Sequence, residues 1–155
     1  MIKTASDIMT RNVICAGLED SVNDLINSFI DNRISSVPVV DKQGNLVGVV
    51  TKTDILAHIV NLDLDLTLKV ALKDVLGAHA DGTEISVSSV SDLKVRDIMT
   101  SNPITAAEST PVKKLAEMMI EHAIHRIVIT NRGRITGILS TLDLLYFIAE
   151  KERNG

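Results

Sequence analysis

Cysteine, aromatic residues and long apolar runs are scarce in this chain of 155 residues, and each shortage excludes a class of protein. The single cysteine, Cys15, excludes an intramolecular disulfide and a cysteine-based zinc site. Aromatic residues make up 2% of the sequence, so the usual stacking platform for single-stranded nucleic acid is missing. No apolar run reaches the roughly 18–20 residues that span a bilayer. Residues 1–10 lack the apolar core of a signal peptide.

Positively charged residues are also fewer than negatively charged ones. Sixteen Lys and Arg residues face 20 Asp and Glu residues, a net charge of −4, which argues against non-specific binding to nucleic acid. The sequence shows no nucleophile with a base, no paired acids, no metal-spaced cluster and no glycine-rich phosphate loop of the Rossmann or P-loop type. We therefore expect a soluble cytoplasmic protein that is not an enzyme, holds no metal, and binds neither nucleic acid nor membrane.

What the chain does contain is an internal repeat. Asp7–Thr10, with the sequence D-I-M-T, recurs letter for letter as Asp97–Thr100. A unit of about 50 residues rarely buries a sufficient core alone, so the two copies should be two halves of one core. A cleft between packed halves is a natural ligand site. Further matched pairs are Asn12 with Asn102, Val22 with Val112, Leu25 with Leu115, Gly48 with Gly137, and Asp54 with Asp143.

Each copy begins with an apolar stripe at helical spacing. In copy one the predicted helix has Asp20 as its N-cap. In copy two Thr110 is the expected cap, with Pro111 at the first helical position, where its missing N–H costs little. The stripes are Val22, Leu25, Ile26, Phe29 and Ile30 in copy one, and Val112, Leu115, Ala116, Met119 and Ile120 in copy two.

Two β-branched runs joined by a glycine-containing turn follow each helix and predict a β-hairpin. Pro38 predicts that its strand lies at an edge or starts there. A second helix should start near Asp54 and near Asp143, and short strands near 13–14 and 103–104 should precede each first helix. The hairpin runs are 37–40 and 46–51 in copy one, and 127–129 and 135–140 in copy two.

The predicted fold class is α/β (α+β), with two tandem helix–hairpin–helix repeats packed about a pseudo-two-fold axis. Repeat 1 spans 1–60, a connector spans 61–92, and repeat 2 spans 93–155. Residues 59–76 are apolar enough to extend the second helix. Residues 77–92 are rich in Ser, Asp and Gly, which predicts a loop.

This order of motifs resembles the CBS domain (the cystathionine-β-synthase type), and two copies in tandem resemble a CBS pair, or Bateman module. The resemblance implies an adenosine-containing ligand such as AMP, ADP, ATP or S-adenosylmethionine, bound in clefts between the repeats. It also implies regulation of another, unidentified protein, here by a stand-alone pair. The residues that carry it are Asp7–Thr10, Val37–Asp41 and Gly48–Asp54 in copy one, and Asp97–Thr100 and Gly137–Asp143 in copy two.

Thr51 with Asp54, and Ser140 with Asp143, are candidate ligand contacts at the predicted strand-to-helix junctions. An ionised Asp offers two acceptor oxygens, which suit the adjacent hydroxyls of a ribose, and free N–H groups at a helix start favour an anion. The resemblance assigns the ribose to the two Asp residues. The same spacing also fits a capping box, with Thr51 and Ser140 as N-caps, and one Asp could serve both ends.

His125 and Arg126 form the sharpest difference between the copies, because Ser35 and Ser36 stand in their place. The resemblance implies that a His-Arg pair here meets phosphate, which a guanidinium grips in a bidentate way. The alternative is a solvated arginine beside a partly buried histidine. Candidates for an apolar adenine slot are Ile14, Ile34, Val37, Ile104, Ile124 and Ile127.

Two further expectations concern assembly and the thiol. The last helix is apolar around most of its circumference, and CBS pairs often stack through their helices, so we expect a homodimer. The rival function is a ligand-free dimerisation or interaction scaffold. Cys15 aligns with Thr105 on a predicted strand, and the sequence places no His or acid near it, which favours a buried structural thiol over a nucleophile.

Overall fold

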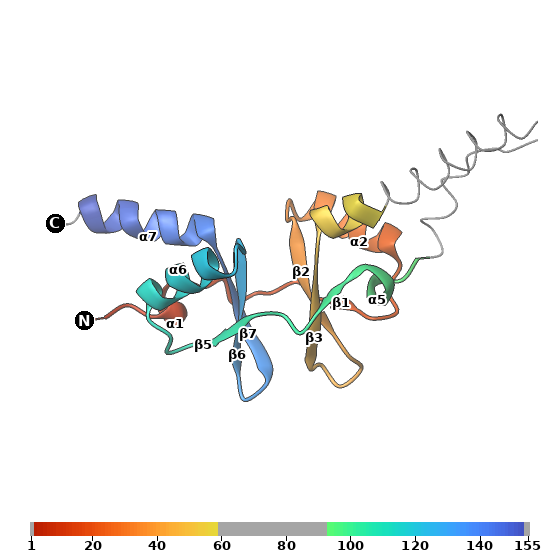
Figure 1. Ribbon diagram of the computed structural model, residues 1–155, viewed down its shortest axis with the longest axis horizontal. Helices are drawn as coiled ribbons and strands as arrows, with labels where there is room; N and C mark the ends of the chain where they lie inside the picture. The colour runs from red at the N-terminus through yellow and green to blue at the C-terminus, as the bar shows by residue number, and fades with distance from the viewer. Residues whose placement is uncertain (1, 59–92, 154–155) are drawn as a thin grey trace, which may run out of the picture.

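The computed structural model describes residues 2–58 and 93–153, with side chains up to 150. Two sheets stand next to each other in the middle of the molecule, with α1, α6 and α7 outside one sheet and α2 and α5 outside the other (Figure 1). This confirms the predicted α/β fold of two helix–hairpin–helix repeats. The predicted helix over 59–76 and loop over 77–92 lie outside the described residues, so the boundaries of the connector stay a prediction.

The strands form two sheets. One has the order β1-β2-β3-β4 and the other β5-β6-β7. Their bounds are β1 (Ala16–Gly17), β2 (Ser36–Val40), β3 (Leu46–Thr51), β4 (Thr100–Ser101), β5 (Thr105–Ala107), β6 (Arg126–Asn131) and β7 (Arg134–Ser140). The predicted hairpins are β2–β3 and β6–β7, both antiparallel. Their turns need glycine, because Gly44 (φ 79°) and Gly133 (φ 78°) adopt the left-handed conformation.

The helices begin close to the predicted positions, but both N-caps differ by one residue. Ser21 caps the first long helix, with its side chain accepting from the N–H of Asp24, because Asp20 instead accepts from the N–H of Gly17. Pro111 is itself the second N-cap, since its carbonyl accepts the first helical bond. The helices are α1 (Ala5–Ile8), α2 (Val22–Asp31), α5 (Val95–Ile98), α6 (Val112–Glu121) and α7 (Thr141–Arg153), and residues 52–58 are also helical.

The apolar stripes are buried except at their ends. Val22, Leu25 and Phe29 are core residues, as are their counterparts in α6. Ile30 is 67% exposed and Ile120 is 82% exposed, so the last residue of each stripe lies outside the core. The cause is helical geometry, because the last residue of each stripe comes eight positions after the first and so lies about a fifth of a turn further around the helix.

Three strand predictions need correction. The short strand β1 begins three residues later than expected and β5 two residues later. β2 is an interior strand, although Pro38 itself has no β1 partner, because β1 pairs only with Val39 and Val40. Cys15 is exposed rather than buried, since its neighbour Ala16 takes the buried position of the strand.

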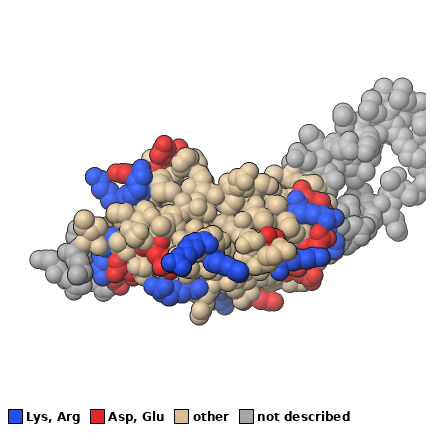
Figure 2. Space-filling model, turned by 90° about the horizontal axis from the view of Figure 1, so that it is seen from below, with Lys and Arg blue, Asp and Glu red and all other residues tan. Residues whose placement is uncertain are grey.

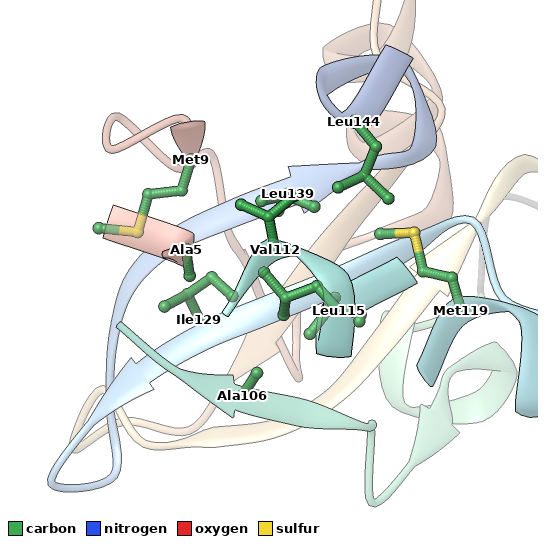
Figure 3. Packing of buried hydrophobic residues seen from close by; sticks show 10 residues of the cluster. Ala5, Met9, Ala106, Val112, Leu115, Met119, Ile129, Leu139 and Leu144 are labelled. Atoms are coloured by element: carbon green, nitrogen blue, oxygen red, sulfur yellow. The ribbon is translucent and has the colours of Figure 1, made fainter. Parts of the chain in front are cut away.

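Each D-I-M-T motif packs on the other repeat. Ala5 and Met9 lie in one core cluster with Leu115, Ile129 and Leu139 of repeat 2 (Figure 3). Val95 lies in the second cluster, with core residues of repeat 1. We call residues 4–10 and 94–101 the crossing segments. Through this exchange each repeat contributes residues to the core of the other.

Backbone pairing fixes both crossing segments. Thr10 and Ile138 exchange two backbone hydrogen bonds of 2.9 Å, and β4 pairs antiparallel with β3, with Ser101 opposite Gly48. The Asp of each motif caps its own short helix: Asp7 accepts from the N–H of Thr4 at 2.8 Å. This bond, with a smaller contribution from Lys3, lowers the pKa of Asp7.

Gly48 and Gly137 make room for the crossing segments. A Cβ at Gly48 would lie 2.7 Å from the sulfur of Met99 and 2.9 Å from the carbonyl oxygen of Thr100. A Cβ at Gly137 would collide with the Met9 side chain and lie 3.1 Å from the Thr10 carbonyl oxygen. Each glycine therefore leaves the space into which the D-I-M-T motif of the other repeat packs.

Gly137→Ala should lower the free energy of unfolding by about 1–3 kcal/mol, because the added methyl forces the crossing segment away from β7. Urea unfolding of the full chain measures the change. Gly17→Ala is the control, since a Cβ there meets only the side chain of Asp20, at 3.2 Å. Equal stability of the two variants would show that the crossing segment yields without cost.

Candidate ligand-binding site

The first Thr-x-x-Asp motif forms the capping arrangement at the end of β3. The Asp54 carboxylate oxygen Oδ2 accepts from the N–H and the hydroxyl of Thr51, both at 2.7 Å. In return the N–H of Asp54 donates to the Thr51 hydroxyl at 3.2 Å. The capping interpretation is confirmed for this copy.

The second motif has the same geometry at the end of β7. Asp143 Oδ2 accepts from the Ser140 N–H at 2.7 Å and from its hydroxyl at 2.6 Å, and the Asp143 N–H donates to the hydroxyl at 3.3 Å. Within the described residues, none of these bonds uses Oδ1 of either Asp. One carboxylate oxygen of each motif is thus left to accept from a ligand.

A first cleft, the Asp143 cleft, has a volume of about 200 Å³ and lies between segments of both repeats. Repeat 2 contributes the end of β7 with Ser140 and Asp143, and repeat 1 contributes the chain after its crossing segment. Its principal lining residues are Asn12, Ile14, Ile34, Ser36, Arg126 and Asp143. The volume falls below the roughly 300–1,000 Å³ of most ligand pockets, so a nucleotide bound there would extend beyond it.

A second cleft, the Thr51 cleft, has a volume of about 380 Å³ and mirrors the first. Here Thr51 comes from repeat 1, and the chain after the second crossing segment comes from repeat 2. Its principal lining residues are Thr51, Asn102, Ile104, Ile124, His125 and Arg126. Both clefts therefore join the end of a hairpin in one repeat to the start of the other repeat.

Most predicted site residues line one of these clefts. Ile14, Ser140 and Asp143 line the first. Thr51, Val37, Ile104 and His125 line the second. Arg126 lines both.

Two predicted residues line neither cleft. Asp54 is confined to its capping role in this structure. Ile127 is 0% exposed and belongs to the core of repeat 2, which corrects its assignment to the adenine slot. Side chains alternate along a strand, so Ile127 faces the core, whereas Arg126 and Val128 line the Thr51 cleft.

Asn12, Asn102 and Ser36 are lining residues that the sequence analysis did not single out. Asn102 precedes Pro103 and has φ 54°, a left-handed conformation that Asn tolerates better than most residues. The repeated Asn12/Asn102 match was the available signal. For Ser36, only its place opposite Arg126 in the alignment of the two copies pointed to the site.

The exposure of the His-Arg pair differs from the second of the two sequence interpretations. His125 is exposed and Arg126 is half-buried, the reverse of a solvated arginine beside a partly buried histidine. The buried hydroxyl of Ser36 has no hydrogen-bond partner among the described residues. An unpaired buried hydroxyl costs about 1–3 kcal/mol, which a ligand atom at the site can recover.

Outside the two clefts, the described residues also enclose a larger, mostly apolar cavity of about 700 Å³ between α1, α6 and α7. Among residues 2–58 and 93–153 no group of three or more His, Cys, Asp or Glu residues is placed to hold a metal. No helix within those same ranges is long and apolar enough to cross a membrane. Basic and acidic residues alternate along the face seen in Figure 2, without a continuous basic surface.

Comparisons with known proteins agree with this geometry. The CBS domain model matches residues 5–61 and 95–150. An uncharacterized protein of Methanocaldococcus jannaschii is 30% identical over 158 residues, which cover 93% of this chain and 90% of that protein.

Two solved structures share the fold. The crystal structure of the CBS domain pair of protein MJ0100 in complex with 5′-methylthioadenosine and S-adenosyl-L-methionine has a TM-score of 0.73 and 24% identity, covering 97% of this chain and 99% of that one. The crystal structure of CBSX2 in complex with AMP has a TM-score of 0.72 and 24% identity, covering 96% and 98%. With both repeats matched by the family model, the chain belongs to the CBS domain family and is a CBS domain pair.

Proposed function

We propose that this CBS pair is a cytoplasmic regulatory module that senses an adenosine-containing ligand, namely AMP, ADP, ATP or S-adenosylmethionine, and catalyses no reaction. The observation that carries the proposal is the Asp143 cleft, in which a carboxylate with a free Oδ1 lies beside apolar residues and a half-buried arginine. The complexes of MJ0100 with S-adenosyl-L-methionine and of CBSX2 with AMP support this ligand class.

The lining residues offer a suitable partner to each of three parts of the ligand, the ribose, the adenine ring and the phosphate. Asp143 Oδ1 accepts from the ribose hydroxyls, Ile14 and Ile34 offer an apolar surface to the adenine ring, and Arg126 donates to phosphate. The second cleft offers the same kinds of group through Thr51, Ile104 and Arg126, with no lining carboxylate.

Regulation follows from the composition of the clefts. Each is built from both repeats, so a bound ligand bridges them and favours one packing of the repeats over others. A partner protein that contacts both repeats would read that change. The regulated protein is defined here only by that requirement.

AMP, ADP, ATP or S-adenosylmethionine at one hundred times its dissociation constant should stabilise the chain by about 2.7 kcal/mol, a shift in melting temperature of about 5–10 °C. Asp143→Asn should reduce the shift. Asp54→Asn is the matched control, because it alters the same kind of cap without lining either cleft. If no adenosine ligand at millimolar concentration moves the melting temperature, the ligand-free scaffold is the better description.

We also propose that the chain is a homodimer. Large apolar side chains remain exposed on α2, α6, α7 and the helix at 52–58. They are Ile30, Ile120, Leu56, Leu142, Leu145 and Tyr146. Apolar exposure on this scale usually marks an interface, and a stable two-fold interface buries more than roughly 1,000 Å².

Light scattering of the full chain at tens of micromolar should give about twice the monomer mass of 16.8 kDa. Ile120→Glu combined with Leu145→Glu should restore the monomer mass, because two buried charges oppose association. Gln43→Glu in the exposed β2–β3 turn adds charge away from these helices and should leave the dimer intact. A monomer mass for the unaltered chain, with and without ligand, would rule out the dimer.

A further inference from the structure

The two clefts share a wall. Ser36, Arg126 and Ile138 line both of them. Ser36 and Arg126 occupy equivalent positions, since each begins the first hairpin strand of its repeat, β2 or β6. Equivalent residues that meet both clefts lie at the pseudo-two-fold axis, so this wall is where the two sites come closest.

The shared wall carries one permanent positive charge. Arg126 is the sole Lys or Arg among the described residues that line either cleft, and its counterpart Ser36 is neutral. The guanidinium forms no hydrogen bond or ion pair with a described residue. His125 adds a group to the Thr51 cleft only, and Asp143 adds a negative charge to the other.

Ser36 gives an independent sign that the wall is incomplete without a ligand. Its hydroxyl is buried and has no hydrogen-bond partner among the described residues, although the residue itself pairs with Thr51 in the β2–β3 hairpin. A hydroxyl can donate to an anion, but it brings no charge. Two phosphate groups at this wall would therefore compete for a single guanidinium.

We propose that the two clefts hold one phosphate group between them, so that a first phosphorylated adenosine ligand weakens the binding of a second, whereas an unphosphorylated adenosine does not. The inference rests on the proposed function. The first phosphate neutralises the charge of the Arg126 guanidinium, and the second then meets a like charge at the shared wall. The chain then binds one nucleotide strongly and a second one more weakly.

Calorimetric titration of the full chain with AMP and with adenosine tests the coupling. Ile14→Trp fills the Asp143 cleft, and Ile104→Trp fills its counterpart. In the variant whose stronger cleft is filled, AMP binds only to the other cleft. Its affinity there should be about tenfold higher than the affinity with which the unaltered chain binds its second AMP. Adenosine should show no such gain. Equal AMP constants in the filled variant and in that second step would overturn the proposal, as would an equal gain for adenosine.

Arg126→Ala gives a second route that fills no cleft. It should reduce the ratio of the two AMP dissociation constants to the ratio found for adenosine, because the contested donor is gone. An unchanged AMP ratio would overturn the shared-arginine inference while leaving adenosine binding, and with it the proposed function, intact. Failure of the unaltered chain to bind either compound would overturn both.

Discussion

Ile127→Ala should lower the free energy of unfolding by about 2–5 kcal/mol, measured by urea unfolding without ligand. Ile127 lies on β6, the first strand of the repeat 2 hairpin, and is fully buried in one cluster with Leu115 and Leu139. Removing three carbon atoms leaves a cavity that this packed cluster cannot close.

Ile104→Ala is the matched control for Ile127→Ala. Ile104 is half-buried and lines the Thr51 cleft, so its loss should cost less stability and should weaken adenosine binding instead. If Ile127→Ala weakened adenosine without destabilising the fold, the earlier assignment of Ile127 to the adenine slot would be restored.

Arg126→Ala should weaken the tightest AMP binding step by about 1.5–3 kcal/mol, the value of a hydrogen bond to a charged group, or roughly ten- to more than a hundredfold. Adenosine binding should change little, because adenosine lacks the phosphate. Calorimetry with both compounds on the same preparation measures the difference.

Arg132→Asn is the control for Arg126→Ala, since it removes the same charge at an exposed turn position. Asn tolerates the left-handed conformation of that residue (φ 49°). Equal weakening of AMP and adenosine by Arg126→Ala would mean that Arg126 supports the walls of the clefts rather than the phosphate. If Arg126→Ala and Arg132→Asn weakened AMP binding equally, the loss would come from the lower positive charge of the protein and not from a lost contact with the phosphate.

The sequence allowed the repeats, hairpins and capping motifs to be predicted because each depends on residues close together in the chain. Thr51-x-x-Asp54 is one such local pattern, and the hydrogen bonds of the cap confirm it. The position of Ile30 and Ile120 at the edge of each stripe also follows from the sequence, but whether a neighbouring element covers that edge does not.

The candidate site shows the same division. Thr51, Ser140 and Asp143 could be proposed from the motif alone. That Arg126 lines both clefts, and that Ile127 lines neither, depends on how two sheets meet. Periodicity within one strand distinguishes its two faces but does not say which face meets the core. The exchange of the crossing segments was also not predictable, because the two motifs are identical and the sequence does not show on which repeat each one packs.

The exchange of the crossing segments has a consequence for synthesis on the ribosome. Domains generally fold in the order in which their residues emerge, but α1 and Met9 find their binding surface on α6 and β7, more than a hundred residues further along the chain. Residues 4–10 are thus made well before the surface on which they dock. Until that surface forms, Ala5 and Met9 stay accessible to chaperones and proteases, and a ribosome that stalls before residue 138 leaves a nascent chain in which residues 4–10 lack their partner strand.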